Sequence, residues 1–385
     1  MAGDGWGAVR RTCPPVRTMR RSRPPFAETT GHLEVDGGRI FYRALGGPRR
    51  PTVLVLHGGP SDHRYLAMLA DLVPRGYRVV WYDQLGCGRS SRPRSYREYT
   101  METFGRQAES VRRALGLGRP HLFGHSWGGA LALEAATLYP RSFRSLSVCG
   151  GFGSATSFGN ALRRHTHRLP RALREPIERY EREGNYVSPE YRAAIAERRR
   201  VYSTGVRVLP YEFAATASGV NPRLLRAVYG PNRGLLSPPG GLLRGWDLRP
   251  RLARIRLPTL IMSGEIGAGR YTARDLHRWL PNSERVTFPG AAHLPFYQSR
   301  DRFLETMLRF LDAIPSPGPT RTIRRSAPAG ATTRPDGPRP TTACASSGPA
   351  CDGASASCAT SSACGRASSK PAKNVSSSPR PNGRG

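Results

Sequence analysis

The stretch Gly124–Gly129, which reads GHSWGG, constrains the fold of this 385-residue chain more than any other. A short apolar segment, residues 120–123, precedes it, and strong helix formers fill residues 130–136 after it. Ser126 therefore lies between an expected strand and an expected helix. Glycines two positions to either side suit a sharp turn there, because larger side chains would collide with the neighbouring strand or helix. The pattern predicts a nucleophile elbow with Ser126 as the nucleophile.

Apolar runs of strand length alternate with helical segments on both sides of this turn. Continuous apolar runs are typical of strands buried on both faces of a parallel sheet, and short connections favour right-handed crossovers. Two strands around Gly37-Gly38 have the spacing of a hairpin, which would form an antiparallel edge. We therefore expect an α/β fold with a mostly parallel central sheet. The expected inner strands are residues 52–56, 77–82, 120–123, 144–149, 258–263 and 284–288.

Composition divides the chain into five segments. Residues 1–27 are basic and contain proline, and residues 315–385 hold hardly any large apolar side chain, so both are predicted to be disordered. The α/β alternation occupies residues 28–154 and 246–314. Between these two core parts, residues 155–245 are polar, arginine-rich and helical in composition. We expect them to form a helical cap over the carboxyl ends of the strands, where open α/β folds bind ligands.

The net charge of +33 suggests nucleic-acid binding, since a basic surface releases counterions from phosphates. Lys370 and Lys373 are the only lysines, however, and the arginines are scattered along the whole chain instead of clustering on one element. We therefore expect no specific nucleic-acid partner and only weak, non-specific affinity for polyanions.

The cysteines and the hydropathy pattern exclude further classes of protein. Seven cysteines, without paired spacing, fit neither a zinc site nor a closed disulfide framework. No apolar run approaches the roughly 18 residues that cross a bilayer, and the N-terminus lacks the apolar stretch of a signal peptide. The sequence thus favours a soluble, cytoplasmic protein with neither a metal nor a membrane partner.

A serine nucleophile needs a neighbouring base, and histidine has the pKa that suits this role near neutrality. His293 is the best candidate, because it follows the last expected strand and a parallel sheet would bring it beside Ser126. His57 and His125 adjoin glycine turns and are interpreted as structural.

Acyl transfer also needs hydrogen-bond donors for the oxyanion. In a fold with this elbow, one donor is the backbone N–H of the residue after the nucleophile, here Trp127. The glycine-rich loop His57-Gly58-Gly59-Pro60 follows a buried strand and would supply the second donor, from Gly59. An ordinary tight turn is the alternative interpretation of this loop.

Several motifs follow one another in a fixed order along residues 31–314. They are His57-Gly58-Gly59-Pro60, the run Asp83-Gln84-x-Gly86-x-Gly88-x-Ser90, Gly124–Gly129, Gly230-Pro231-Asn232 and a late Gly-x-x-His293. Together they resemble the proline iminopeptidase family of α/β-hydrolases. The resemblance implies an α/β-hydrolase fold with a helical cap, and an enzyme that releases an N-terminal residue, often proline, from short peptides. It further implies an acyl-enzyme on Ser126, a small peptide or acyl substrate, and no cofactor.

The sequence departs from this family at the acid of the catalytic triad. The family pattern places an aspartate in the loop after the strand 258–263, as Gly-x-x-Asp, and here Gly267 occupies that position. Loss of the acid in a serine protease costs roughly 10⁴ in kcat. Glu265, two positions earlier, is the candidate replacement, and Asp275 is a weaker one because it is expected inside the following helix. A triad without an acid is the alternative.

A second departure concerns the substrate's free amine, which family members hold with acidic residues of the cap. One of these acids lies in a Gly-Pro-x-Glu-Phe motif, and here Arg233 follows Gly230-Pro231-Asn232. An arginine would repel an ammonium group. Glu212 is the candidate substrate-binding residue, with a solvated position on the cap as the alternative. Two other functions therefore remain open: an esterase or amidase with altered specificity, and a catalytically defective hydrolase that acts as a binding protein.

Overall fold

The computed structural model describes residues 26–205, 211–231, 234–236 and 238–315. These residues belong to a compact unit that covers residues 1–320, and the second unit, residues 321–385, lies outside the described residues. The N-terminal segment 1–25 and the tail 316–385, both predicted to be disordered, also lie outside them, so that prediction is not tested.

A single eight-stranded sheet forms the centre of the described part, in the order β1-β2-β4-β3-β5-β6-β7-β8. β2 pairs antiparallel with β1 and with β4, and every other neighbouring pair is parallel. The mostly parallel α/β sheet with an antiparallel edge is therefore confirmed. The strands are β1 (Glu28–Val35), β2 (Gly38–Leu45), β3 (Thr52–Leu56), β4 (Arg78–Tyr82), β5 (His121–His125), β6 (Leu146–Cys149), β7 (Thr259–Gly264) and β8 (Ser283–Phe288).

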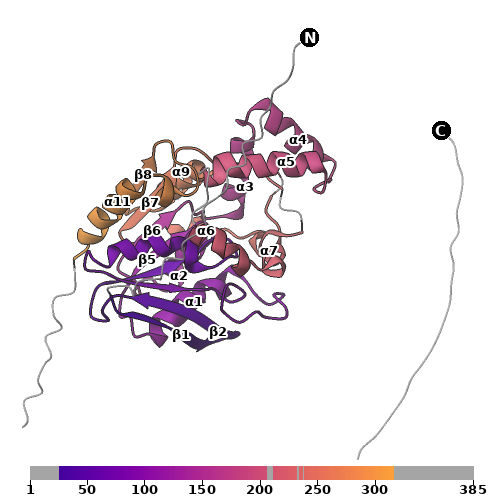
Figure 1. The fold of residues 1–385 in the computed structure, drawn as a ribbon. Helices are drawn as coiled ribbons and strands as arrows, with labels where there is room; N and C mark the ends of the chain where they lie inside the picture. Colours follow the sequence, from indigo (N-terminus) through magenta and orange to yellow (C-terminus); the bar gives the residue numbers. More distant parts are fainter. Residues whose placement is uncertain (1–25, 206–210, 232–233, 237, 316–385) are drawn as a thin grey trace, which may run out of the picture. The chain divides into compact units, whose positions relative to one another are not determined.

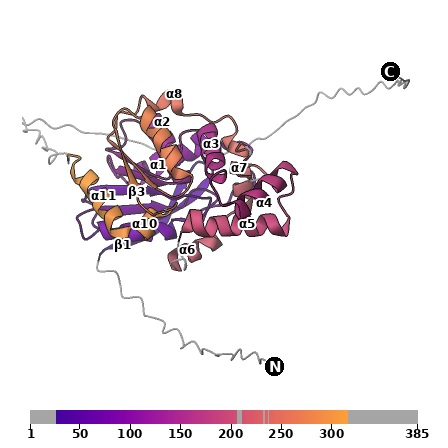
Figure 2. The ribbon, with the colours of Figure 1, turned by 90° about the horizontal axis from the view of Figure 1, so that it is seen from above.

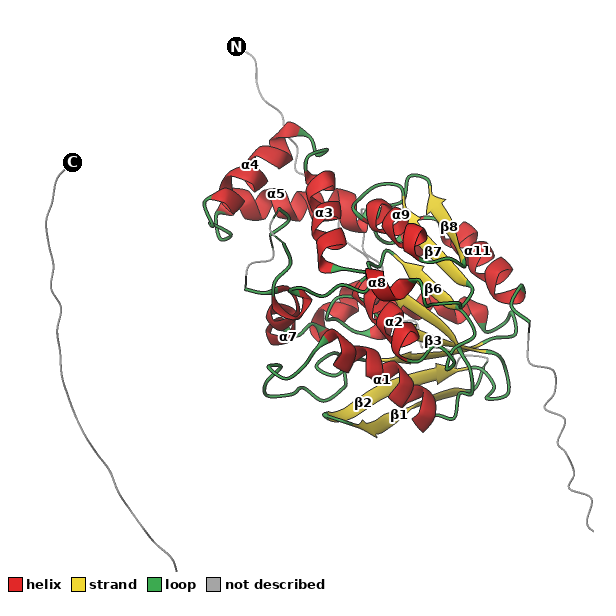
Figure 3. Cartoon of the chain, turned by 180° about the vertical axis from the view of Figure 1, so that it is seen from behind, coloured by secondary structure: helices red, strands yellow, loops and turns green. Residues whose placement is uncertain are grey.

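Helices cover both faces of this sheet, because alternate side chains of each inner strand point to opposite faces. In β3, Leu54 and Leu56 pack into one apolar cluster with α1 (Met101–Ala114), α2 (Trp127–Leu138) and α9 (Gly269–Trp279). Val53 and Val55 pack into a second cluster with the 3₁₀ helix η1 (His63–Leu72) and with α11 (Arg300–Asp312). Figure 3 shows α1 and α2 in front of the strands.

The remaining helices lie in the cap or connect strands. Figures 1 and 2 both show α3, α4, α5 and α7 gathered beyond one end of the strands. Apart from a single bridge between Ser154 and Asp247, the described residues of the cap form no β-pairing. These elements are α3 (Ala155–Thr166), α4 (Arg171–Arg182), α5 (Pro189–Arg199), α6 (Tyr211–Ala215), α7 (Pro222–Tyr229), α8 (Arg249–Leu252) and α10 (Pro295–Gln298), with the short turns η2 (Arg200–Thr204), η3 (Thr216–Gly219) and η4 (Gly241–Leu243).

The cap has a small apolar core of its own. Leu169, Ile177, Tyr191 and Ala194 are buried together between α4 and α5. Charged residues cover the outside, and exposed pairs such as Arg171–Glu175 contribute little to stability. None of the helices in the described ranges is both long and apolar enough to cross a bilayer.

Candidate active site

The turn between β5 and α2 holds Ser126 in a strained conformation. Its φ of 54° makes it the one non-glycine residue with a positive φ among the residues that the structure describes. Such strain persists only where the surrounding structure enforces it. A Cβ atom at Gly124 would lie 2.3 Å from the carbonyl oxygen of Gly128, and one at Gly128 would lie 2.2 Å from that of Leu56. Glycine is therefore required on both flanks, and Ser126 is presented at the tip of a sharp turn.

The loop after β3 passes directly against this turn. A Cβ atom at Gly58 would lie 2.9 Å from the Cβ atom of Ser126. The next residue, Gly59, has a φ of 89° and lines the same cavity as Ser126. Trp127 begins α2, so its backbone N–H has no acceptor within the helix. Neither this N–H nor that of Gly59 donates a hydrogen bond to another described residue, and both are available to an oxyanion.

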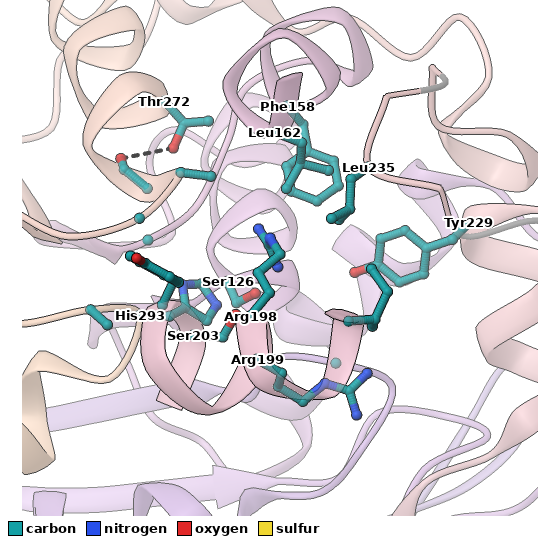
Figure 4. Close-up of a pocket in the computed structure, with 18 of the residues that line it drawn as sticks. Ser126, Phe158, Leu162, Arg198, Arg199, Ser203, Tyr229, Leu235, Thr272 and His293 are labelled. Atoms are coloured by element: carbon teal, nitrogen blue, oxygen red, sulfur yellow. Dashed lines mark hydrogen bonds between the residues drawn. The ribbon is translucent and has the colours of Figure 1, made fainter. Parts of the chain in front are cut away.

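His293 lies in the loop after β8 and lines the same cavity as Ser126. Burial, together with the positive charge of Arg198, lowers the pKa of His293 to about 4. Its backbone N–H donates to the carbonyl oxygen of Ser203 at 3.0 Å, which ties the loop to the cap. Figure 4 shows Ser126 and His293 at the same wall of the cavity. The described residues offer no hydrogen bond to the Ser126 hydroxyl, and such catalytic contacts are often long before a substrate binds.

A buried chain of hydrogen bonds connects the loop after β3, at Gly58, to the loop after β8, at His293. The Gly58 N–H donates to the Tyr65 hydroxyl at 2.5 Å, and this hydroxyl lies 2.8 Å from Nδ1 of His125. Nε2 of His125 lies 3.0 Å from the carbonyl oxygen of His293. The tautomer with the proton on Nε2 satisfies every group of this chain. Burial lowers the pKa of His125 far below its ordinary value, which keeps the ring neutral and suited to this structural role.

The sequence did not reveal Tyr65 as part of this chain. His125 was interpreted as structural from its position beside a glycine turn, and its hydrogen bonds agree with that interpretation. The only available signal for Tyr65 was its place in the segment that follows the glycine-rich loop, and that signal does not distinguish it from an ordinary core tyrosine.

The structure does not bring Glu265 to His293. The Glu265 side chain is exposed, and its carboxylate accepts a hydrogen bond from the Gly290 N–H at 3.0 Å. Among the described residues, no carboxylate pairs with the His293 ring. Asp275 lies inside α9, as expected, and acts electrostatically on Arg249. The hypothesis that Glu265 orients His293 thus finds no support in this arrangement, because the Glu265 carboxylate accepts from the backbone of the loop after β8, at Gly290, and not from the His293 ring.

The backbone at Gly267, the position of the family acid, also disfavours an aspartate side chain. Gly267 has a φ of 115°, which L-residues rarely adopt, and a Cβ atom there would lie 2.9 Å from the carbonyl oxygen of Tyr202. A Cβ atom at Gly150, after β6, would lie 3.0 Å from Nδ1 of His293. Gly267 and Gly150, which occupy the position of the family acid and the turn after β6, thus both pack closely against other atoms.

The cavity over Ser126 and His293 has a volume of about 640 Å³ and lies between the strand ends and the cap. Phe158, Leu162 and Tyr229 form an apolar wall, which Figure 4 shows opposite Ser126. The described lining residues include Arg192, Arg198 and Arg199 and neither Asp nor Glu. The side chain of Glu212, the predicted amine-binding residue, and residues 232 and 233 lie outside the described residues.

Comparison with known proteins relates the chain to a family of hydrolases. Residues 51–182 match the alpha/beta hydrolase fold family. The chain is 36% identical over 291 residues to the proline iminopeptidase of Lactobacillus delbrueckii subsp. lactis, which covers 74% of this chain and 98% of that protein. It is 30% identical over 287 residues to the proline iminopeptidase of Thermoplasma volcanium, over 73% of this chain and 96% of that protein.

The chain belongs to the proline iminopeptidase family of α/β-hydrolases.

The fold agrees with this assignment. The crystal structure of proline iminopeptidase from Mycobacterium smegmatis superposes with a TM-score of 0.69 at 27% identity and covers 74% of this chain and 98% of that one. The chain is thus a hydrolase of the proline iminopeptidase family with an eight-stranded, mostly parallel sheet. Gly267 stands where the family pattern has an acid, and the described cavity lining carries three arginines.

Proposed function

We propose that this protein is a serine hydrolase that releases an N-terminal residue, with proline preferred, from short peptides through an acyl-enzyme on Ser126. The observation that carries the proposal is the strained Ser126 turn, which shares one cavity with His293 and with Gly59, whose N–H donates to no other described residue. A strained serine between a strand and a helix, with a histidine and two free amides nearby, is the arrangement that acyl transfer requires.

In the proposed mechanism, His293 takes the proton of the Ser126 hydroxyl as the oxygen attacks the scissile carbonyl carbon. The N–H groups of Gly59 and Trp127 stabilise the developing oxyanion. His293 then gives the proton to the leaving amine, and water hydrolyses the acyl-enzyme by the reverse sequence of proton transfers. No cofactor enters any step.

The protonation state of His293 suits a base but also limits its strength. A pKa of about 4 leaves the ring neutral at neutral pH, so that it can accept a proton. A base with a low pKa drives proton transfer weakly, and no carboxylate among the described residues pairs with the His293 ring to stabilise the imidazolium that forms. We therefore expect slow turnover, lower than that of a complete triad by up to roughly 10⁴.

Turnover of aminoacyl arylamides tests the proposal directly. Prolyl arylamide should be hydrolysed faster than alanyl or glutamyl arylamides, and Ser126→Ala should abolish the activity. Equal background rates for the native protein and Ser126→Ala, with both proteins folded by circular dichroism, would refute the proposal.

An esterase or amidase with altered specificity is the second candidate function. It is favoured by the cavity wall, whose described residues carry positive charges without a carboxylate to hold an ammonium group. Turnover of simple acyl esters without turnover of prolyl arylamides would decide for it. A defective hydrolase that acts as a binding protein, suggested by Gly267, would instead hold ligand unreacted and leave Ser126 unlabelled by an acylating or phosphonylating probe.

A further inference from the structure

Arg198 is a buried cation that has no ion-pair partner in the part of the chain that the structure describes. It lies at the end of α5, and only 8% of its surface is exposed, whereas its neighbour Arg199 is exposed. Its Nε atom is buried without a hydrogen bond, and Arg198 forms no ion pair with any residue in the described ranges. Figure 4 shows its side chain extending into the cavity between Ser126 and the apolar wall.

Glu181, the described acid that acts electrostatically on Arg198, is hydrogen-bonded to other groups. Glu181 attracts the charge of Arg198, but its carboxylate accepts hydrogen bonds from the Tyr191 hydroxyl at 3.0 Å and from the backbone N–H groups of Leu235 and Leu236 at 2.7 and 2.9 Å. These bonds hold the loop at residues 234–236 on the cap. Glu181 is therefore a structural acid that lies outside direct contact with Arg198.

An unpaired buried guanidinium destabilises a fold, because removing a charge from water costs free energy that only a counter-charge or hydrogen bonds can offset. Burial lowers the pKa of Arg198 to about 10, which still leaves it charged near neutrality. Nothing in the packing of the described residues requires a charge at this position. The missing counter-charge therefore points to a ligand that enters the cavity.

The residues around Arg198 indicate the charge of that ligand and where it would bind. The lining residues in the described ranges are cationic at Arg192, Arg198 and Arg199 and include no acid, so the cavity attracts an anion and disfavours an ammonium group. The charge of Arg198 also acts on His293. An anion bound to Arg198 would consequently lie near the reacting atoms.

We propose that Arg198 is a specificity-determining residue that binds a carboxylate of the substrate close to the scissile acyl group. A guanidinium binds a carboxylate through two parallel hydrogen bonds, which fixes orientation as well as charge. This inference rests on the proposed function only in taking the cavity of Ser126 as the reacting site. The carboxylate can belong to the leaving group, as in a dipeptide, or to the acyl part, as in a half-amide of a dicarboxylic acid.

Binding to the Ser126→Ala variant, measured by titration calorimetry, tests the inference without catalysis. Prolyl-alanine against prolyl-alaninamide places the carboxylate on the leaving group. Glutaryl anilide against its carboxamide analogue places it on the acyl part. In at least one pair, the carboxylate should bind roughly 10- to 100-fold more tightly than the carboxamide, as expected for a desolvated charge-assisted contact. Equal affinities within both pairs would overturn the inference.

Variants of Arg198 separate a binding role from a structural one. In the same background, Arg198→Gln and Arg198→Met should remove the preference for carboxylate, while Arg182→Gln, which removes an exposed arginine of α4 outside the cavity, should keep it. Arg198→Met should also keep or raise the midpoint of thermal unfolding, because it removes an unpaired buried charge. A preference that survives in both Arg198 variants would overturn the assignment.

The two proposals fail separately. If the native protein hydrolyses arylamides at Ser126 but shows no carboxylate preference, the proposed function stands and the role of Arg198 falls. If carboxylates bind through Arg198 while Ser126 never reacts, the anion site stands and the hydrolase mechanism falls.

Discussion

The pH dependence of Ser126 acylation should reveal the low pKa of His293, whose ring pairs with no carboxylate among the described residues. Acylation requires neutral His293, whose pKa is lowered to about 4 by burial and by Arg198. The rate should therefore rise with pH through about 4 and stay flat above it. At pH 5, about 90% of the ring would be neutral with this pKa, against about 3% with an ordinary value of 6.5. The assay is the second-order rate of labelling by a fluorophosphonate probe from pH 4.5 to 8.

A rate that falls about tenfold or more between pH 7 and pH 5 would refute this reasoning, since it would show a histidine with a raised or ordinary pKa. Circular dichroism at each pH is the necessary control. Buried His121 and His165, whose pKa values are each lowered to about 4, bind protons more readily in the unfolded state. Stability should consequently fall as the pH drops from about 6.5 toward 4, and labelling is compared only where the protein stays folded.

Three substitutions test the geometry of the site. Gly128→Ala should lower the free energy of unfolding by at least about 3 kcal/mol, because its Cβ atom would lie within 2.4 Å of two backbone oxygens, whereas Gly47→Ala meets no atom within 4 Å and should be tolerated. Tyr65→Phe should cost about 2–5 kcal/mol, because it leaves a buried N–H and a buried imidazole nitrogen unpaired, and should slow acylation. Glu265→Gln should leave kcat unchanged, because a glutamine oxygen can still accept from the Gly290 N–H.

Each of these expectations has a contrary result. Equal unfolding midpoints in urea for Gly128→Ala and Gly47→Ala would show that the elbow backbone is not as close as described. Full stability and full labelling in Tyr65→Phe would show that the hydrogen-bond chain has no role in positioning. A fall of around 10³ in kcat for Glu265→Gln would establish that carboxylate as the acid of the triad after all.

The elbow and the sheet could be predicted because both depend on short-range features of the chain. Glycines at positions 124 and 128 indicate that the backbone there lies too close to its neighbours for a side chain. Continuous apolar strands such as Thr52–Leu56 indicate burial on both faces of the sheet. These signals belong to a few adjacent residues, so they are visible without knowing what packs against them.

The unusual chemistry of the site could not be predicted in the same way. Arg198 lies in a helix rich in arginine, and nothing in the sequence distinguishes it from its exposed neighbour Arg199. Its burial depends on how the cap meets the strand ends. The direction of the Glu265 carboxylate likewise depends on a hydrogen bond to Gly290, 25 positions away. Such features depend on contacts between residues far apart in the sequence, which local composition does not predict.

Site-specific phosphonylation tests whether Ser126 is a nucleophile that His293 activates. The native protein and the variants Ser126→Ala and His293→Ala are treated with a fluorophosphonate probe, and the modified peptide is located by mass spectrometry. We expect one adduct, on Ser126, that is absent from Ser126→Ala and strongly reduced in His293→Ala. A folded native protein that carries no adduct, or labelling of Ser126 that does not depend on His293, would contradict it.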